Sequence, residues 1–218
     1  MTFEEIEKNE TIRAYISKAD ESLVALGYTE HSFAHVTHVA AMACYLLETL
    51  GYDAHTVELA KIAGYLHDIG NLVNRIEHSQ SGAVMAFQIL TSLGFGAEDV
   101  ATIVTAIGNH DESTAFPVNA VAAALILADK TDVRRTRVRN RDKATFDIHD
   151  RVNYAVEKAS TTLDAAGKAV VLDLQLDTGM SPVIDYFEIF LERMLLCRKA
   201  AEKLGLSFRL VVNGQTVL

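Results

Sequence analysis

The chain has 218 residues, half of them hydrophobic, so it can bury one substantial core and a small second domain. Its net charge of -9 and isoelectric point near 5.3 argue against a general binder of nucleic acid or anionic membranes, although a local basic patch is compatible with both values. The two cysteines form neither a metal-binding spacing nor a disulfide framework, which indicates a reducing compartment. Since neither a signal-like start nor a run of about eighteen apolar residues occurs, we expect a cytoplasmic protein without a membrane partner.

Successive helices are predicted over the first part of the chain from the spacing of apolar side chains. They cover residues 3–26, 32–50, 53–69, 78–93, 97–109 and 117–130, with Thr29 as an alternative start of the second helix. A capping-box pattern from Thr2 to Glu5 starts the first helix, and Gly27 ends it. Pro117 starts the last helix, because proline is favoured in a first turn.

Histidines and aspartates occupy inward positions on these helices, where the spacing otherwise places apolar side chains. His35, for example, precedes Val39 and Ala43 by four and eight residues, so it shares their apolar stripe. The complete set is His35, His67, Asp68, His78, His110 and Asp129. Mixed imidazole and carboxylate ligands suit iron, manganese, zinc, cobalt or nickel better than calcium or magnesium. The pattern favours a transition-metal site, with a purely structural polar network as the alternative.

The residues around the first of these positions, and around the His-Asp pair, resemble the HD-domain superfamily of metal-dependent phosphohydrolases. A Val-Ala pair follows His35 by four and five residues, as in the family's first-ligand helix. Helical spacing leaves open whether His31, His35 or His38 points inward, and the resemblance favours His35. Residues 64–70, Gly-Tyr-Leu-His-Asp-Ile-Gly, resemble the family's signature.

The remaining motifs resemble the six-ligand branch of this superfamily, and the likeness covers about residues 20–140. His78 and His110 match the two additional histidines of the binuclear members, and Asp129 matches the closing aspartate. The resemblance implies a mainly α fold with an HD-type helical bundle, which we assign to residues 1–145 as a metal-binding domain. It also implies two divalent transition-metal ions, with iron or manganese preferred and zinc, cobalt or nickel as alternatives.

Two departures from the family pattern bear on the substrate. Asn71 stands where many relatives have a lysine, so an expected phosphate contact is missing there. Asn109 stands where the branch that acts on cyclic dinucleotides has a second histidine, and no Gly-Tyr-Pro motif follows, which disfavours that activity. Two chemistries remain, namely hydrolysis of phosphate esters or nucleotides and the reaction of mixed-valent di-iron oxygenases.

A cluster of basic residues directly follows the last predicted metal ligand. Its members are Lys130, Arg134, Arg135, Arg137, Arg139, Arg141 and Lys143. On a continuing helix, Lys130, Arg134 and Arg137 share one face, and their charged groups suit phosphate oxygens. We therefore expect these three residues to bind a phosphorylated small-molecule substrate, with a solvated helix end as the alternative. Nucleic acid is disfavoured because no extended basic surface with interleaved aromatic residues accompanies the cluster.

After about residue 145 the apolar pattern changes to alternation with period two, which is typical of strands. Strands are predicted at 151–157, 169–176, 208–212 and 215–218, and a helix from Ser181 to Leu204. A turn near Ala165 to Gly167 joins the first two strands, and Asn213-Gly214 joins the last two. Residues 146–218 are thus predicted to form a small α+β region with the order β-β-α-β-β. We expect it to serve in dimerisation, as cover of the substrate site or in ligand sensing, and a homodimer would form through it.

The combined hypothesis is a metal-dependent phosphohydrolase that cleaves a phosphate ester of a nucleotide or another phosphorylated small molecule. In this hypothesis Asp68 bridges two metal ions, and a hydroxide held between them attacks phosphorus. Asp111 or Glu112, next to His110, orients a ligand or protonates the leaving group. A mixed-valent di-iron oxygenase and a non-enzymatic, metal-stabilised sensor are the alternatives.

Overall fold

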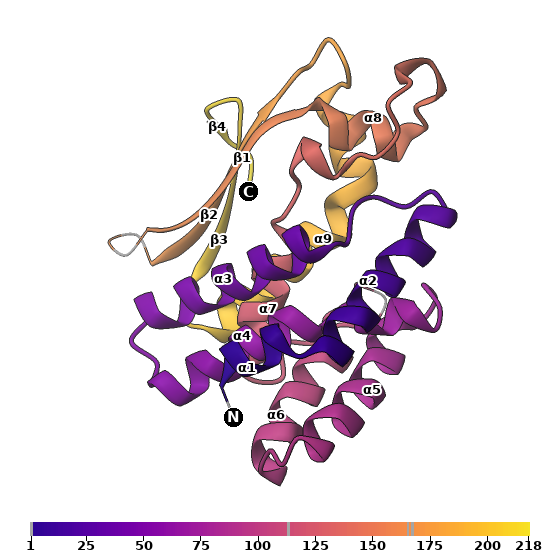
Figure 1. Ribbon diagram of the computed structural model, residues 1–218. Coiled ribbons are helices and arrows are strands. Elements are labelled where there is room, and N and C mark those ends of the chain that lie inside the picture. The colour runs from indigo at the N-terminus through magenta and orange to yellow at the C-terminus, as the bar shows by residue number, and fades with distance from the viewer. Residues whose placement is uncertain (1, 113, 165, 167) are drawn as a thin grey trace.

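The computed structural model describes residues 2–112, 114–164, 166 and 168–218 of the chain. A bundle of helices lies below a small curved sheet (Figure 1). The bundle contains α1 (Phe3–Lys8), α2 (Glu10–Ala25), α3 (Phe33–Thr49), α4 (Ala54–Leu66), the 3-10 turn η1 (Ile69–Leu72), α5 (His78–Ser92), α6 (Ala97–Gly108) and α7 (Ala120–Lys130). The predicted mainly α fold with a helical bundle is therefore confirmed.

The first predicted helix is interrupted, and this part of the prediction was wrong. Asn9 has an extended backbone, and its side-chain oxygen accepts the backbone N–H groups of Thr11 and Ile12. Asparagine is among the best N-cap residues because it satisfies N–H groups that have no partner within the helix. The chain therefore starts a new helix at Glu10 instead of continuing α1.

Helices α3 and α4 pack against each other at close range around Gly64. A Cβ atom at this position would lie 2.8 Å from the Cα of Ala40, so only glycine permits the contact. Gly64 lies three residues before His67, at the end of α4. The close contact therefore fixes this end of α4 against α3, which carries His35.

The C-terminal region confirms the predicted β-β-α-β-β order. Its elements are α8 (Ile148–Ala155), β1 (Val156–Asp164), β2 (Ala169–Leu176), α9 (Val183–Lys203), β3 (Ser207–Val212) and β4 (Gln215–Thr216). The described strands have the order β1-β2-β3-β4, in which β2 and β3 are parallel and the other pairs are antiparallel. The parallel pair is possible because α9 crosses from one strand to the other. Because of this sheet, a description of the fold as all-α is only partly right.

Two details of this region differ from the prediction. Residues 151–155 belong to α8 and not to a strand, because Asp147 caps this helix by accepting the N–H of Asp150. The last strand is shorter than expected and contains only Gln215–Thr216. Residues 165 and 167 of the predicted turn lie outside the described residues.

The sheet packs onto the bundle through a shared apolar core. Alternate residues of β2, such as Leu172 and Leu174, are buried, whereas Asp173 is exposed. The same core contains Leu46 of α3 and Ile126 of α7. One continuous core therefore joins the two regions, and the predicted domain boundary at residue 145 remains a prediction.

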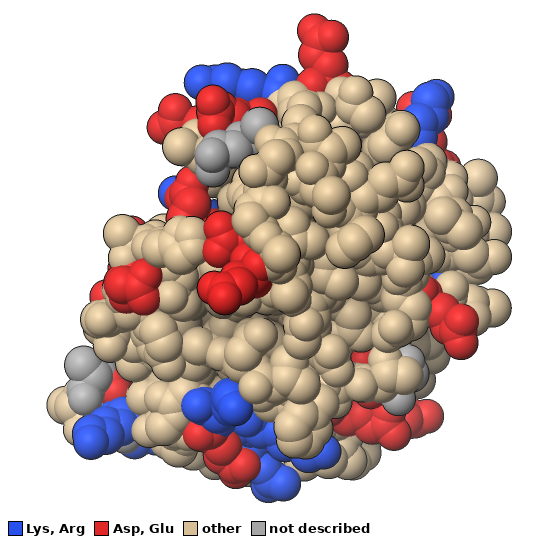
Figure 2. Space-filling model, turned by 90° about the horizontal axis from the view of Figure 1, so that it is seen from below, with Lys and Arg blue, Asp and Glu red and all other residues tan. Residues whose placement is uncertain are grey.

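The surface of the bundle is mixed in charge on the face seen from below (Figure 2). Acidic side chains are scattered over a largely uncharged surface, and basic side chains lie toward its rim. In the described part of the chain, no helix has both the length and the apolarity needed to cross a lipid bilayer.

Candidate metal centre

The predicted metal ligands lie together inside the bundle. They are His35, His67, Asp68, His78, His110 and Asp129, and each of them is at most 8% exposed. These residues come from the ends of α3 to α7, or from the residues that directly follow them. Helices from distant parts of the sequence therefore direct their polar ends to one point.

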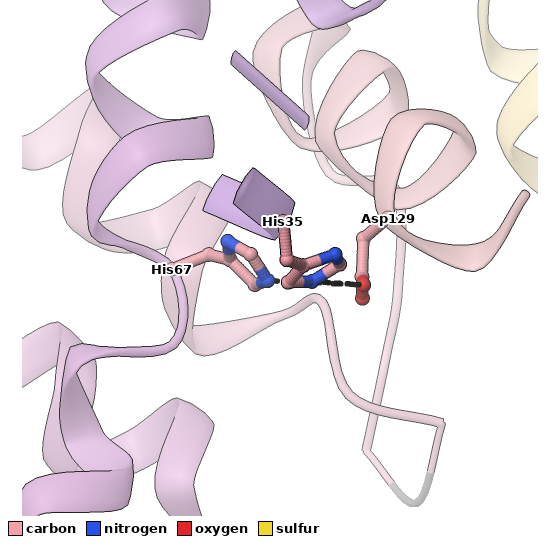
Figure 3. Close-up of side chains that lie close together, drawn as sticks. All are labelled: His35, His67 and Asp129. Carbon is pink, nitrogen blue, oxygen red and sulfur yellow. Dashed lines mark ion pairs between the residues drawn. The ribbon is translucent and has the colours of Figure 1, made fainter. Parts of the chain in front are cut away.

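Imidazole nitrogens of His35 and His67 face the carboxylate of Asp129 (Figure 3). His35 Nε2 lies 3.3 Å from Asp129 Oδ1 and 3.5 Å from Asp68 Oδ2. His67 Nε2 lies 3.2 Å from Asp68 Oδ2 and 3.7 Å from Asp129 Oδ1. Atoms that bind one ion at about 2.1 Å lie about 3 to 4 Å apart, so these separations match shared metal ligation.

His78 and His110 extend the cluster beyond Asp68. His78 Nε2 lies 3.5 Å from Asp68 Oδ1 and 3.2 Å from the Nε2 of His110. Two groups of possible ligands can be distinguished, one of His35, His67 and Asp129 and one of His67, Asp68 and His110. The groups share His67, whereas the sequence hypothesis shares only Asp68 between the two ions.

Hydrogen bonds at Nδ1 fix the tautomers of the four imidazoles. In His67, His78 and His110, Nδ1 donates to the backbone carbonyl three residues earlier, at 2.8, 3.1 and 2.6 Å. In His35, Nδ1 lies 2.8 Å from a carboxylate oxygen of Asp132. A neutral imidazole carries one proton, so a proton on Nδ1 leaves a lone pair on Nε2. All four lone pairs are thus directed into the cluster.

A cation satisfies the acceptors of this cluster better than protein donors do. Within the described residues, His35 Nε2, His67 Nε2 and Asp68 Oδ2 are buried and have no hydrogen-bond partner. A buried acceptor without a donor is costly, and the short contact between His78 and His110 brings two lone pairs together. The donor set and the hydrogen bonds behind it therefore fit transition-metal ions.

The ionisation states of Asp68, Asp129 and His110 suit metal binding. Burial raises the pKa of Asp68, but the imidazole of His67 and other neighbours outweigh it and hold this pKa well below its usual range. Burial raises the pKa of Asp129 too, but the Lys130 ammonium at 2.7 Å outweighs it and holds this pKa well below its usual range. Burial lowers the pKa of His110 well below its ordinary value. Ionised carboxylates and neutral imidazoles are the forms that bind metal ions. For His67, burial lowers the pKa, but the Asp68 carboxylate outweighs it and raises this pKa, so a metal ion would bind His67 in place of a proton.

Asp132 is a residue of the site that the sequence did not reveal. Its buried carboxylate accepts Nδ1 of His35 and binds Arg134 through Nε at 2.5 Å and Nη2 at 2.9 Å. Burial raises the pKa of Asp132, but the hydrogen bonds from Arg134 and His35 lower it below its usual range. A carboxylate behind a histidine orients the ring and makes its Nε2 a better ligand. Asp132 follows the end of α7, so no apolar stripe marks it.

A pocket of about 460 Å³ opens over the cluster. Asp68, His78 and Asp129 contribute to its lining. Its cationic residues are Arg75, Lys130, Arg137 and Arg193. Asn153 of α8 and Phe190 of α9 also line it, so the C-terminal region forms part of the pocket wall. Whether that region serves as cover of the substrate site, in dimerisation or in ligand sensing remains a prediction.

The structure separates the three predicted substrate residues. Helix α7 ends at Lys130, and the chain turns at Thr131, so the predicted helical face through Arg134 and Arg137 was wrong. Lys130 and Arg137 still line the pocket over the cluster. Arg134 is held by Asp132 and lines a separate pocket of about 240 Å³.

Lys130 is buried between two carboxylates. Its Nζ lies 2.7 Å from Asp129 and 3.2 Å from Glu112, and although burial opposes its charge, the two carboxylates raise its pKa. Glu112 also accepts Nε of Arg193 at 2.8 Å. Burial raises the pKa of Glu112, but Lys130 and Arg193 outweigh it and lower this pKa, so Glu112 is a poor proton donor. Of the two residues predicted to protonate the leaving group, Asp111 is therefore the remaining candidate, and its role remains a prediction.

Three further pocket residues were not predicted as site residues. Arg75 lies in the connection between η1 and α5, and Arg193 lies on α9, where no pattern relates either of them to the ligand helices. A signal existed for His31, because it flanks His35, and their ring centroids are 5.5 Å apart. Its Nδ1 lies 2.7 Å from the carbonyl oxygen of Thr29. The Nδ1 of His31 thus bonds a nearby backbone carbonyl, as the Nδ1 atoms of His67, His78 and His110 do.

The fold and the site define a helical domain with a buried cluster of histidines and aspartates that could hold metal ions. The model of the HD domain family matches residues 32–157, and the chain belongs to this family. The chain is 26% identical over 181 residues to the uncharacterized protein MJ1020 of Methanocaldococcus jannaschii, which covers 72% of this chain and 70% of that protein. It is also similar to the crystal structure of a predicted HD superfamily hydrolase from an uncultured Thermotogales bacterium. That likeness has 23% identity and a TM-score of 0.47, and it covers 60% of this chain and 73% of the other.

Proposed function

We propose that the chain is a metal-dependent phosphohydrolase that acts on a nucleotide or another phosphorylated small molecule. The observation that carries this proposal is the convergence of imidazole lone pairs and carboxylates beside a pocket that is lined by cationic side chains. Cationic groups favour an anionic substrate, and guanidinium groups suit phosphate oxygens. A pocket of about 460 Å³ suits a small molecule.

The buried cluster is proposed to hold two divalent transition-metal ions, with iron or manganese preferred and zinc, cobalt or nickel as alternatives. When bound, such ions stabilise the charge that develops on a phosphate group and lower the pKa of a water molecule. One ion would be held by His35, His67 and Asp129, the other by His78 and His110, with Asp68 shared.

The remaining polar residues have supporting roles in this proposal. Asp132 orients His35, and Lys130 keeps Asp129 ionised and in place. Arg193 and Arg137 bring positive charge to the pocket. Asp111, next to His110 in sequence, would give a proton to the leaving group.

The test combines elemental analysis of freshly purified protein with a phosphatase screen over nucleotides, sugar phosphates and an aryl phosphate with added manganese. We expect phosphate release by the wild type and no release by Asp68→Asn, because this variant loses the central carboxylate. Asp173→Asn is the matched control, since it removes an exposed charge from β2. Oxygen consumption by the iron-loaded protein without phosphate release would instead support the di-iron oxygenase. Neither activity, together with a ligand-dependent change in oligomeric state, would support the sensor.

A further inference from the structure

Arg75 differs from the other cationic residues of the pocket in its partners. Lys130 and Arg193 form ion pairs with Glu112. Arg137 donates its Nε and Nη1 to backbone carbonyls. Among the residues that the structure describes, Arg75 has no carboxylate partner. Its charge is therefore available to an anion that enters the pocket.

The guanidinium of Arg75 also keeps one binding edge open. Both of its hydrogen bonds are long and are made by Nη1, at 3.4 Å from Asn71 Oδ1 and 3.4 Å from His78 Nε2. Within the described parts of the chain, its Nε and Nη2 bind no other group. An Nε–Nη2 edge can bind two oxygens of one anion with parallel hydrogen bonds. In Arg134 the Nε–Nη2 edge already binds Asp132, so this edge is not available to another anion.

The surroundings of Arg75 hold its guanidinium at the pocket. The backbone carbonyl of Arg75 accepts Nδ1 of His78 at 3.1 Å, which fixes its main chain beside the cluster. Glu77 has a left-handed backbone, with φ of 55°, and this turns the chain directly into α5. The Cζ of Arg75 lies 5.6 Å from the ring centroid of Tyr28, within the distance of a cation–π interaction. Both side chains line the pocket, and neither Nε nor Nη2 is needed to keep them there.

Asn71 connects Arg75 to the central carboxylate. Its Nδ2 donates to the carbonyl and to Oδ1 of Asp68, each at 2.9 Å, while its Oδ1 accepts Nη1 of Arg75. Asn71 is buried, and its amide supplies no charge. Arg75, four residues later, supplies a positive charge next to the same part of the site.

We propose, on the basis of the function proposed above, that Arg75 binds the phosphate group of the substrate. Its Nε–Nη2 edge would hold two phosphate oxygens, while Asn71 and Tyr28 set the orientation of the guanidinium. A lysine ammonium carries the same charge but lacks two parallel donors. Charge and geometry can therefore be tested separately at this position.

The experiment measures the affinity of the metal-loaded protein for inorganic phosphate by titration calorimetry. The variants are Arg75→Gln, Arg75→Lys and the matched control Arg135→Gln. Arg135 is also partly buried and lies over a tyrosine ring, but it does not line the pocket. We expect about a ten- to hundredfold weaker affinity for Arg75→Gln, an intermediate loss for Arg75→Lys and no change for Arg135→Gln. Metal content and melting temperature show whether each variant folds and loads normally.

The KM and kcat of the best substrate from the screen give a second measurement. A phosphate-binding role predicts that Arg75→Gln raises KM for phosphorylated substrates and weakens inhibition by phosphate, with unchanged metal content. If the wild type binds phosphate and Arg75→Gln binds it equally well, Arg75 is not the phosphate residue, whatever the reaction. If the wild type binds phosphate but hydrolyses no phosphate ester, the proposed hydrolase is wrong while the loss of affinity in Arg75→Gln still supports the anion site.

Discussion

Asp132→Asn tests whether the residue behind His35 controls the metal centre. The variant keeps an oxygen that can accept Nδ1 of His35 at the present 2.8 Å, but it loses the negative charge. Its new amide group also faces Arg134, which donates through Nε and Nη2 to the natural carboxylate. Substitution of such a supporting carboxylate typically costs ten- to a hundredfold in metal affinity, or about 1.4 to 2.8 kcal/mol. We expect a loss of this size.

The same substitution should also destabilise the metal-free protein. Removing one partner of a buried ion pair costs about 3 to 5 kcal/mol. The side chain of Arg134 is 33% exposed, so water recovers part of this cost, and we expect a loss near the lower end, about 3 kcal/mol. The pKa of Asp132 is lowered in the folded state, so the difference between wild type and variant should be complete above the ordinary value of 3.8. It should be lost only as the pH falls below that value.

Metal affinity is measured by competition with a chelator followed by elemental analysis, and stability by urea unfolding of the metal-free proteins. Asp173→Asn serves as the control, because it removes the same charge from the exposed face of β2. If Asp132→Asn matches Asp173→Asn in both measurements, the carboxylate behind His35 has no part in holding the metal or the fold.

Three further predictions concern His78, the glycines Gly70 and Gly108, and Cys197. His78→Ala should lower the metal content, measured by elemental analysis, from about two ions per chain to about one. If the wild type holds one ion and the variant retains it, His78 does not bind a second ion. Gly70→Ala should cost at least about 2 kcal/mol in urea unfolding, because its Cβ would lie 2.0 Å from the carbonyl oxygen of His78. Gly108→Ala, with its nearest contact at 3.5 Å, should change stability by less than about 1 kcal/mol, and equal losses would contradict the clash. Burial raises the pKa of Cys197 to about 12, so at pH 8 only about one Cys197 thiol in ten thousand is ionised. Mass spectrometry should therefore find Cys197 alkylated only after the protein is unfolded.

The sequence was most informative where a polar residue interrupts a regular apolar stripe. His35 shares the face of Val39 and Ala43, and that face must be buried if the helix is to pack at all. The helix therefore carries the imidazole inward, and the same reasoning placed the other predicted ligands in the cluster.

The sequence was least informative where a contact depends on how distant segments meet. Asp132 lies after the last turn of α7, and Arg75 lies in a connection, so neither has a periodic pattern around it. Arg193 meets Glu112 only because α9 packs against α7 and the residues after α6. The alternation at 151–155 indicated a strand, but the cap from Asp147 favours a helical turn that local hydropathy does not reveal.

The bonds at Nδ1 divide the histidines into two kinds. His67, His78 and His110 are each oriented by a backbone carbonyl three residues earlier in the sequence. These rings acquire their direction as soon as the local turn forms, and losing one of them leaves the direction of the others intact. His35 takes its direction from a partner 97 residues away, so it is oriented only once the ends of the domain have met. If the chain holds two ions as proposed, single substitutions at His78 or His110 would remove ligands of the second ion alone, whereas the ion at His35 would need the complete fold.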